Sequence, residues 1–240
     1  MVTVYSGIVL NQIKYSDSQI ITRVFSPELG SKSYLLRSRK SGKGVNRSII
    51  QPLSLSSFSC ALQESKGLQT IEEVQLARPY THIPFDPIKS SITLFLQELM
   101  HKCLPEDYVN DQLYTFLKNA LILLDDAWDA RNFHVWSMLE ISRHFGFYPL
   151  TTPAMASLYF NVEDGLFSET PSPNSLDLHT SGILADLLHR DWSEVQSMDL
   201  HSSTRRMLLH GLSNFLRYHL DGLREIKSIE ILQEVFHTEG

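Results

Sequence analysis

The residues of this chain that could do chemistry are its carboxylates, histidines and cysteines, and their spacing argues against a catalytic centre. Asp125, Asp126 and Asp129 in LLDDAWDAR include an i,i+4 carboxylate pair that could hold a divalent metal, but no further ligand follows at suitable spacing. We expect an exposed helix end there. The ten histidines include no HExxH motif, and SGKGV departs from the phosphate-loop pattern at two positions. The chain is therefore predicted to be no enzyme and to hold no metal.

Composition indicates where the protein is located and which kinds of site it lacks. Cys60 and Cys103 match neither a redox pair nor half of a zinc site, so we expect two buried, reduced thiols. No apolar run approaches the roughly 20 residues that span a bilayer, and the first residues lack the order of a signal peptide. With 42% hydrophobic residues the chain can bury a core. These features predict a cytoplasmic protein with no membrane contact, and a monomer when free.

Charge is distributed very unevenly along the chain. The net charge is −6, yet residues 1–47 carry eight basic residues against two acidic ones, a balance of +6. Five of the eight lie in LLRSRKSGKGVNRSIIQP, a Ser/Gly-rich segment between two apolar runs. Such a segment can lay cations and backbone N–H groups along phosphates. The predicted DNA contacts are Lys14, Arg23, Lys32, Arg37, Arg39, Lys40, Lys43 and Arg47.

Two kinds of apolar pattern divide the chain. About five short β-branched and aromatic runs fill residues 1–80, which suits a small closed barrel of the OB-fold type. Three prolines in RPYTHIPFDP mark a domain boundary at about residue 80. Beyond it the apolar period becomes helical, apart from a Pro-, Ser- and Gly-rich excursion at 149–175 with at most a short hairpin. We predict an α+β multidomain chain, an OB-fold barrel at 1–80 and a helical domain at 81–240.

Aromatic side chains in the barrel could stack on nucleic-acid bases if they lie on its surface. The candidates are Tyr15, Phe25, Tyr34 and Phe58. Packing inside the barrel is favoured for the two phenylalanines, while for the two tyrosines both interpretations stay open.

The order of several segments resembles that of a known family. The amino-terminal GIVLNQIKYSDSQIITRVFSPELGSKSYLLRSRK, the central MLEISRHFGFYPL and the closing YHLDGLREIKS are similar to the bacterial recombination mediator family RecO across nearly the whole chain. The resemblance implies an OB-fold followed by a helical domain, without enzymatic activity. It also implies binding of single- and double-stranded DNA, annealing of complementary strands, and cooperation with RecR and single-stranded-DNA-binding protein (SSB) in loading RecA on nucleoid DNA.

Two further expectations follow from the resemblance. Many relatives carry a four-cysteine zinc site after the stretch that corresponds to FGFYPL, but this chain has no cysteine there. No cofactor is therefore expected, and packing of Leu158, Phe160, Leu166 and Phe167 would replace the metal. The family also binds the acidic, Phe-terminated SSB tail, which needs an apolar slot beside a cation. The candidate residues for that contact are Arg205, Arg206, Arg217, Tyr218, Arg224 and Lys227.

A different class of function remains open on the residues alone. The negative net charge suits a protein-interaction adaptor that docks SSB and RecR with little DNA affinity of its own. Arginines of the last long helical segment could equally pair with Asp221 and Glu225 on the surface.

Overall fold

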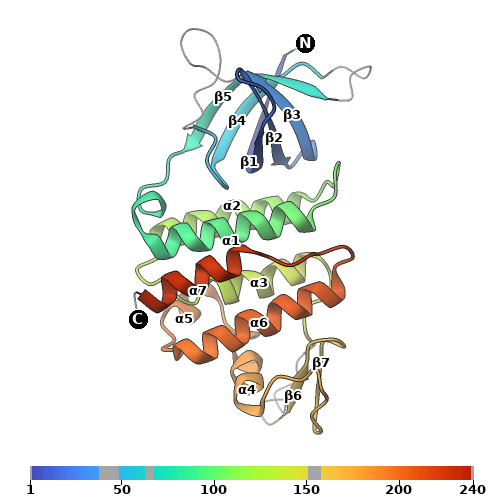
Figure 1. Ribbon diagram of the computed structural model, residues 1–240, viewed down its shortest axis with the longest axis vertical. Coiled ribbons are helices and arrows are strands. Elements are labelled where there is room, and N and C mark those ends of the chain that lie inside the picture. The colour runs from blue at the N-terminus through green and yellow to red at the C-terminus, as the bar shows by residue number, and fades with distance from the viewer. Residues whose placement is uncertain (1, 38–48, 63–67, 151–157, 239–240) are drawn as a thin grey trace. The chain divides into compact units, whose positions relative to one another are not determined.

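The computed structural model describes residues 2–37, 49–62, 68–150 and 158–238 of the chain. These residues form two compact units, Met1–Asp125 and Asp126–Gly240. The first unit contains a barrel and two helices, and the second contains helices and a small hairpin (Figure 1).

The barrel of the first unit is built from five strands in the order β1-β2-β3-β5-β4, closed by pairing of β4 with β1. The strands are β1 (Thr3–Lys14), β2 (Gln19–Ser26), β3 (Gly30–Arg37), β4 (Leu55–Cys60) and β5 (Gln69–Arg78). All neighbours are antiparallel except β3 and β5, whose parallel pairing covers Tyr34–Gln69, Leu35–Thr70 and Leu36–Ile71. The five-stranded OB-type barrel predicted from the sequence is confirmed.

Alternation along the strands explains why the barrel closes. In β2, Ile20, Thr22 and Val24 are buried while Gln19, Ile21 and Arg23 lie between them with partial exposure, so one face of the strand supplies the core. Buried aromatics fill the centre, where the Tyr34 and Phe58 rings meet edge to face with centroids 5.2 Å apart. A side chain at Gly7 would collide with Val24 and Phe58, so glycine permits this close packing.

Helices α1 (Pro87–Cys103) and α2 (Asp111–Asp126) follow a single 3-10 turn, η2 (Ile83–Phe85). Asp86 caps α1 by accepting a hydrogen bond from the Lys89 N–H, and Pro87 opens the first turn. The first compact unit includes α1 and almost all of α2, so these helices belong with the barrel as a structural unit. Gly30, with φ +68°, is needed where the chain passes within contact distance of the Tyr108 carbonyl.

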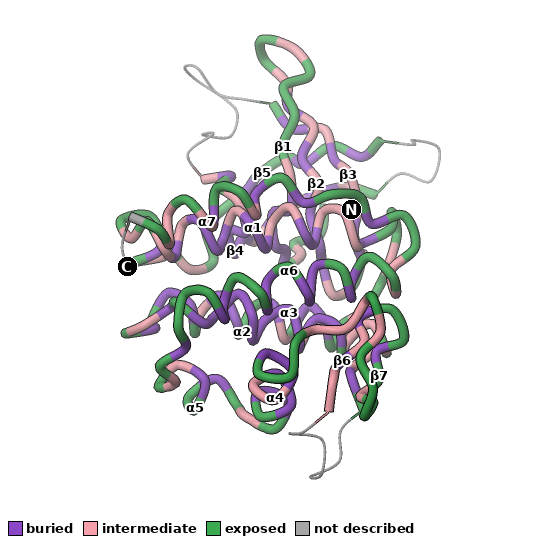
Figure 2. Tube along the Cα trace, turned by 60° about the horizontal axis from the view of Figure 1, so that its bottom comes forward, coloured by how far each residue is buried: buried purple, intermediate pink, exposed green. Residues whose placement is uncertain are grey.

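The second unit contains α3 (Phe133–His144), α4 (Leu178–Leu187), α5 (Trp192–Gln196), α6 (Ser202–His219) and α7 (Ser228–Thr238). Its core gathers the purple, buried stretches of α3, α4 and α6 in Figure 2. Helix α3 ends before Gly146, whose φ of +86° closes the helix. The short α5 was missed by the sequence analysis, although Asp191 and Glu194 form a capping box that marks its start.

The Pro- and Ser-rich excursion contains the short hairpin that the sequence allowed. Strands β6 (Tyr159–Asn161) and β7 (Leu166–Ser168) pair antiparallel. Phe160 is fully buried and contacts Phe167 and Phe215 at centroid distances of 5.0 and 5.6 Å. Leu166 is 51% exposed, so its expected packing role is wrong, because in this hairpin only the face that carries Phe160 meets α6. None of the described helices is long and apolar enough to cross a membrane.

Candidate functional site

The outer face of β1, β2 and β3 carries three rows of side chains that run across the strands. Strand register joins Asn11, Arg23 and Ser33 in one row, and Ile13, Ile21 and Leu35 in the next. A third row joins Tyr15, Gln19 and Arg37, since the Tyr15 N–H bonds the Gln19 carbonyl and Gln19 pairs with Arg37. Directly opposed residues share one face of a sheet, so the three rows form one surface.

The part of this surface nearest the β1–β2 turn is open and mixed in character. Tyr15 is 64% exposed and Ile13 is 58% exposed, and Arg37 is exposed at the end of β3. Within the described part of the chain, no carboxylate forms an ion pair with Arg37. An aromatic ring, an apolar row and a guanidinium on one exposed sheet face can stack on bases and bind a phosphate. We call Ile13, Tyr15, Gln19, Ile21, Leu35 and Arg37 the open face.

The row of Asn11, Arg23 and Ser33 is closed by the end of α1 and the segment after it. Arg23, whose side chain is 14% exposed, donates to the carbonyls of His101 and Leu104 at 3.2 and 2.6 Å. Its Nε also donates to Ser31 Oγ at 2.9 Å. The Ser33 N–H donates to Glu106 at 2.7 Å. We call this region the closed end, and Arg23 serves the fold there.

The remaining predicted DNA contacts fall into two groups. Lys14 pairs with Asp17 at 2.9 Å and Lys32 pairs with Asp107 at 2.8 Å, so both described lysines already meet a carboxylate. Arg39, Lys40, Lys43 and Arg47 lie outside the described residues. Among the described residues, Arg37 is thus the member of the predicted set that faces outward without an ion pair.

The four candidate aromatic residues differ in how far they are buried. Phe25, Tyr34 and Phe58 are buried in the barrel, and burial raises the pKa of Tyr34 well above its ordinary value. Stacking by these three residues is therefore excluded in the folded barrel. Tyr15 alone of the four candidates is exposed and lies on the open face.

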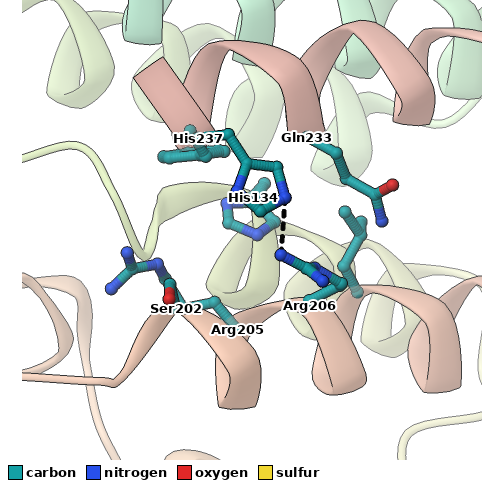
Figure 3. Close-up of a pocket in the computed structure, with 8 residues that line it drawn as sticks. His134, Ser202, Arg205, Arg206, Gln233 and His237 are labelled. Carbon is teal, nitrogen blue, oxygen red and sulfur yellow. Dashed lines mark hydrogen bonds between the residues drawn. The ribbon is translucent and has the colours of Figure 1, made fainter. Parts of the chain in front are cut away.

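A pocket in the second unit collects two of the predicted partner residues. It lies between α6 and α7 and is lined by His134, Ser202, Arg205, Arg206, Leu209, Gln233, Phe236 and His237 (Figure 3). The Arg205 guanidinium lies over the Phe236 ring at 5.8 Å and donates to the Leu200 carbonyl. Arg206 donates to Nε2 of His237 at 2.6 Å. We call this the α6–α7 pocket, and it combines two guanidinium groups with an apolar floor.

The floor of the α6–α7 pocket holds an ionisable group that stays neutral. His134 is 1% exposed, and burial, together with the nearby charge of Arg205, lowers its pKa to about 3. Its ring lies 5.1 Å from the Phe236 ring, and its Nδ1 has no hydrogen-bond partner among the described residues. The positive charge of the pocket therefore comes from Arg205 and Arg206.

The other predicted partner residues lie elsewhere on the surface of the second unit. Tyr218 lines a separate hollow of about 410 Å³ between α6 and residues 162–177, where Arg206 also contributes. Arg217, Arg224 and Lys227 are exposed and belong to neither hollow. The structure thus places Arg206 with Arg205 in one hollow and with Tyr218 in the other, and leaves Arg217, Arg224 and Lys227 outside both.

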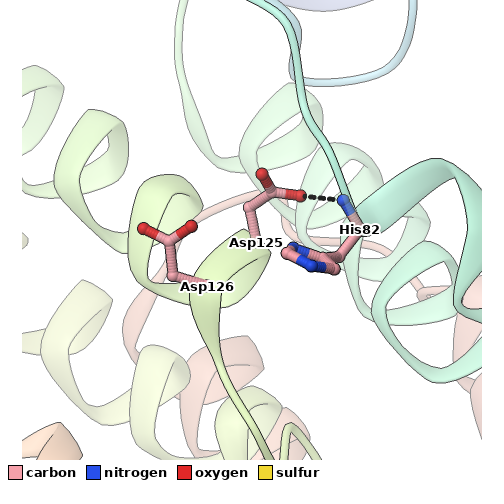
Figure 4. A group of neighbouring side chains, drawn as sticks. All are labelled: His82, Asp125 and Asp126. Carbon is pink, nitrogen blue, oxygen red and sulfur yellow. Dashed lines mark hydrogen bonds between the residues drawn. The ribbon is translucent and has the colours of Figure 1, made fainter.

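Both oxygens of the Asp125 carboxylate accept hydrogen bonds from residues of the same unit. These oxygens accept hydrogen bonds from the N–H groups of Thr81, His82 and Ile83, at 2.8 to 2.9 Å, and from the Thr81 hydroxyl. Figure 4 shows the bond from His82. Burial would raise the pKa of Asp125, but these four bonds outweigh it and lower the pKa. A carboxylate accepts about four hydrogen bonds, so no lone pair remains for a metal.

Asp129, the other half of the possible metal pair, accepts hydrogen bonds from Arg131 at 2.6 and 3.0 Å. Both aspartates are therefore explained by protein contacts. The expectation of an exposed helix end is wrong for Asp125, which is completely buried because residues 81–83, more than forty positions earlier in the chain, turn three N–H groups toward it.

Several residues of the open face and of the α6–α7 pocket were not predicted from the sequence. Ile13, Ile21 and Leu35 could have been found from strand alternation, since each is an apolar residue two positions from a polar one on the outward face. His134, Phe236 and His237 had no such signal, because the pocket joins helices about a hundred residues apart in sequence.

Comparisons with known proteins agree on one family. Residues 1–80 match the family model described as recombination protein O N terminal, and residues 84–228 match recombination protein O C terminal. The chain belongs to the RecO family. It is 36% identical over 233 residues to the DNA repair protein RecO of Flavobacterium psychrophilum and 34% identical to that of Flavobacterium johnsoniae, covering 96% of this chain and 97% of each relative. The Bacteroides fragilis protein is 29% identical over 235 residues.

The zinc site expected in many relatives would fall in the segment that follows FGFYPL in this chain. Residues 149–175 contain neither cysteine nor histidine, so the family's four-thiolate site has no donors here. The corresponding hairpin packs Phe160 against Phe167 and Phe215. Apolar packing joins this hairpin to α6, and the expected absence of a cofactor stays a prediction.

Proposed function

We propose that this RecO-family protein is a recombination mediator that binds DNA through the open face and the cationic segment that follows Arg37. The observation that carries the proposal is the arrangement of Tyr15 and Arg37 in one row beside the apolar Ile13, Ile21 and Leu35. Arg39, Lys40, Lys43 and Arg47 follow directly in sequence. The open face supplies a stacking ring, an apolar surface and a guanidinium, and the following segment adds phosphate-binding cations in sequence.

Charge distribution supports a weak, reversible contact. The chain beyond residue 47 has a balance of −12, from 13 basic and 25 acidic residues, so DNA is repelled from most of the protein surface. Phosphate contacts without base-specific hydrogen bonds leave base edges free to pair with a second strand. This is the property that annealing of complementary single strands requires, and it accommodates duplex DNA as well.

The α6–α7 pocket supports a partner contact. An acidic peptide that ends in phenylalanine, such as the tail of SSB, needs a cation for its carboxylate and an apolar slot for its ring, and Arg206 and the ring of Phe236 mark such a place. In this proposal the pocket brings the protein to SSB-coated DNA, where it acts with RecR to help load RecA.

The experiment is a titration of fluorescent single-stranded DNA at several salt concentrations. Replacing Arg37, Arg39, Lys40 and Lys43 together by Ala should weaken binding for every sequence and flatten its salt dependence, by about 0.7 in log–log slope for each phosphate that the variant no longer neutralises. Lys118→Ala removes a charge from the exposed surface of α2 and is the matched control. Equal slopes for the fourfold variant and the natural sequence would contradict the proposal.

A protein-interaction adaptor is the second candidate, and one observation favours it. Lys14, Arg23 and Lys32 each pair with a carboxylate of the same unit, which weakens the cationic surface of the barrel. An adaptor would show little DNA binding at low salt without partners and no annealing of complementary strands. A strand-annealing assay on bare and SSB-coated DNA separates the two functions.

A further inference from the structure

The α6–α7 pocket is already filled by the protein itself. The cavity that remains measures about 30 Å³, which is room for one water molecule and far too little for an aromatic side chain. The space is taken by Phe236 of α7, whose ring lies 5.1 Å from the His134 ring and 5.8 Å from the Arg205 guanidinium. A ligand with an aromatic end cannot enter while Phe236 stays in position.

The cation of the pocket is occupied as well. A guanidinium has donors and no acceptor, so in the 2.6 Å contact between Arg206 and His237 the Nε2 atom of His237 must supply a lone pair. A carboxylate is a stronger acceptor for a guanidinium than a neutral imidazole is. His237 therefore holds Arg206 by a bond that an incoming carboxylate can replace.

The last turn of α7 is attached less firmly than the part before it. Leu232 is completely buried and anchors the middle of the helix, whereas Phe236 is half-buried and His237 is exposed. Helix ends lose hydrogen bonds at low cost, since their last carbonyl groups have no partner within the helix. The turn that carries Phe236 and His237 can leave the pocket while Leu232 stays in the core.

We propose that the last turn of α7 is an internal occupant of the α6–α7 pocket, which an acidic peptide ending in phenylalanine displaces. Phe236 lies where the ring of the peptide docks, and His237 lies where its terminal carboxylate docks. The inference rests on the peptide contact in the proposed function and adds its regulation: the free protein competes with its own partner. Apparent affinity is then reduced by the fraction of molecules in which the pocket is closed.

The test measures binding of a labelled synthetic peptide, acidic and ending in phenylalanine, to the full-length protein by fluorescence anisotropy. Phe236→Ala and His237→Ala should each tighten binding about 3- to 10-fold, because each removes part of the competitor. Ile231→Ala, a change at a 45% exposed position of the same helix, should leave affinity unchanged. Arg206→Ala should weaken binding about tenfold or more, and so should a peptide whose terminal carboxylate is amidated.

A second measurement covers the case in which a variant loses the helix. Amide hydrogen exchange of the natural sequence should accelerate at residues 235–238 on addition of the peptide and stay constant around Leu232. If the peptide binds through Arg206 but Phe236→Ala does not tighten binding and exchange does not change, the internal occupant is disproved while the partner contact stands. If neither the natural sequence nor any variant binds the peptide, the partner contact itself is disproved and the inference falls with it.

Discussion

The open face and the closed end are two regions of one sheet surface, and they use arginine in opposite ways. Arg37 at the open face is exposed and forms no ion pair with a described residue, whereas Arg23 at the closed end is bound to two carbonyls and a hydroxyl and lies 3.6 Å from Glu106. The two residues are of the same type and lie on adjacent strands. Cationic character in a sequence therefore does not distinguish an arginine that is exposed to solvent from one that joins a helix to a barrel.

The largest expected effect separates these two arginines by stability. Arg23→Ala removes the donor of two partly buried hydrogen bonds to carbonyl groups and should lower the free energy of unfolding by about 3 kcal/mol. Arg37→Ala, at an exposed position, should change it by less than about 0.5 kcal/mol. Urea unfolding followed by circular dichroism gives both values, and equal losses for the two variants would remove the distinction between the regions.

The next effect concerns the open face alone. Tyr15→Ala should weaken binding of single-stranded DNA by about 1 to 2 kcal/mol, because one stacking surface is lost. Tyr15→Phe retains the ring and should bind within about twofold of the natural sequence. Fluorescence anisotropy at fixed salt measures both, and a phenylalanine variant as weak as the alanine variant would show that the hydroxyl, and not the ring, makes the contact.

The smallest effect is a pH dependence that belongs to the closed end. Burial, and then the charge of Arg23, lower the pKa of His101, whose Nε2 faces Asn11 at 3.2 Å. Since the folded pKa lies below the unfolded value of about 6.5, the unfolded state takes up more protons and stability falls as pH decreases below about 6.5. In the His101→Gln variant the free energy of unfolding should fall less between about pH 6.5 and 5 than in the natural sequence. The difference should be at most about 1 kcal/mol. An unchanged slope would mean that another histidine carries it.

Much of the fold and part of the open face could be predicted from local pattern, while the contacts between residues far apart in sequence could not. β-branched alternation in QIITRVF and helical spacing in DQLYTFLKNALILL are short-range signals, and strand β2 and helix α2 form on these two segments. Arg23 and Lys32 form ion pairs with Glu106 and Asp107, which lie more than seventy residues away in sequence. No short-range pattern indicates such a pairing. The burial of Asp125 could not be predicted for the same reason, because its hydrogen-bond partners come from residues 81–83.

The short parallel pairing of β3 with β5 gives the barrel a seam. Three residue pairs join these strands, whereas β2 and β3 are joined over eight. Parting the seam would break few interstrand bonds and would leave the four antiparallel pairings intact. Leu35, which belongs to the open face, is the middle residue of the seam, so widening or narrowing this joint changes the curvature of the surface that a nucleic-acid strand would touch. Among the strand pairings of the barrel, this seam is therefore where a change in breadth would break few interstrand hydrogen bonds.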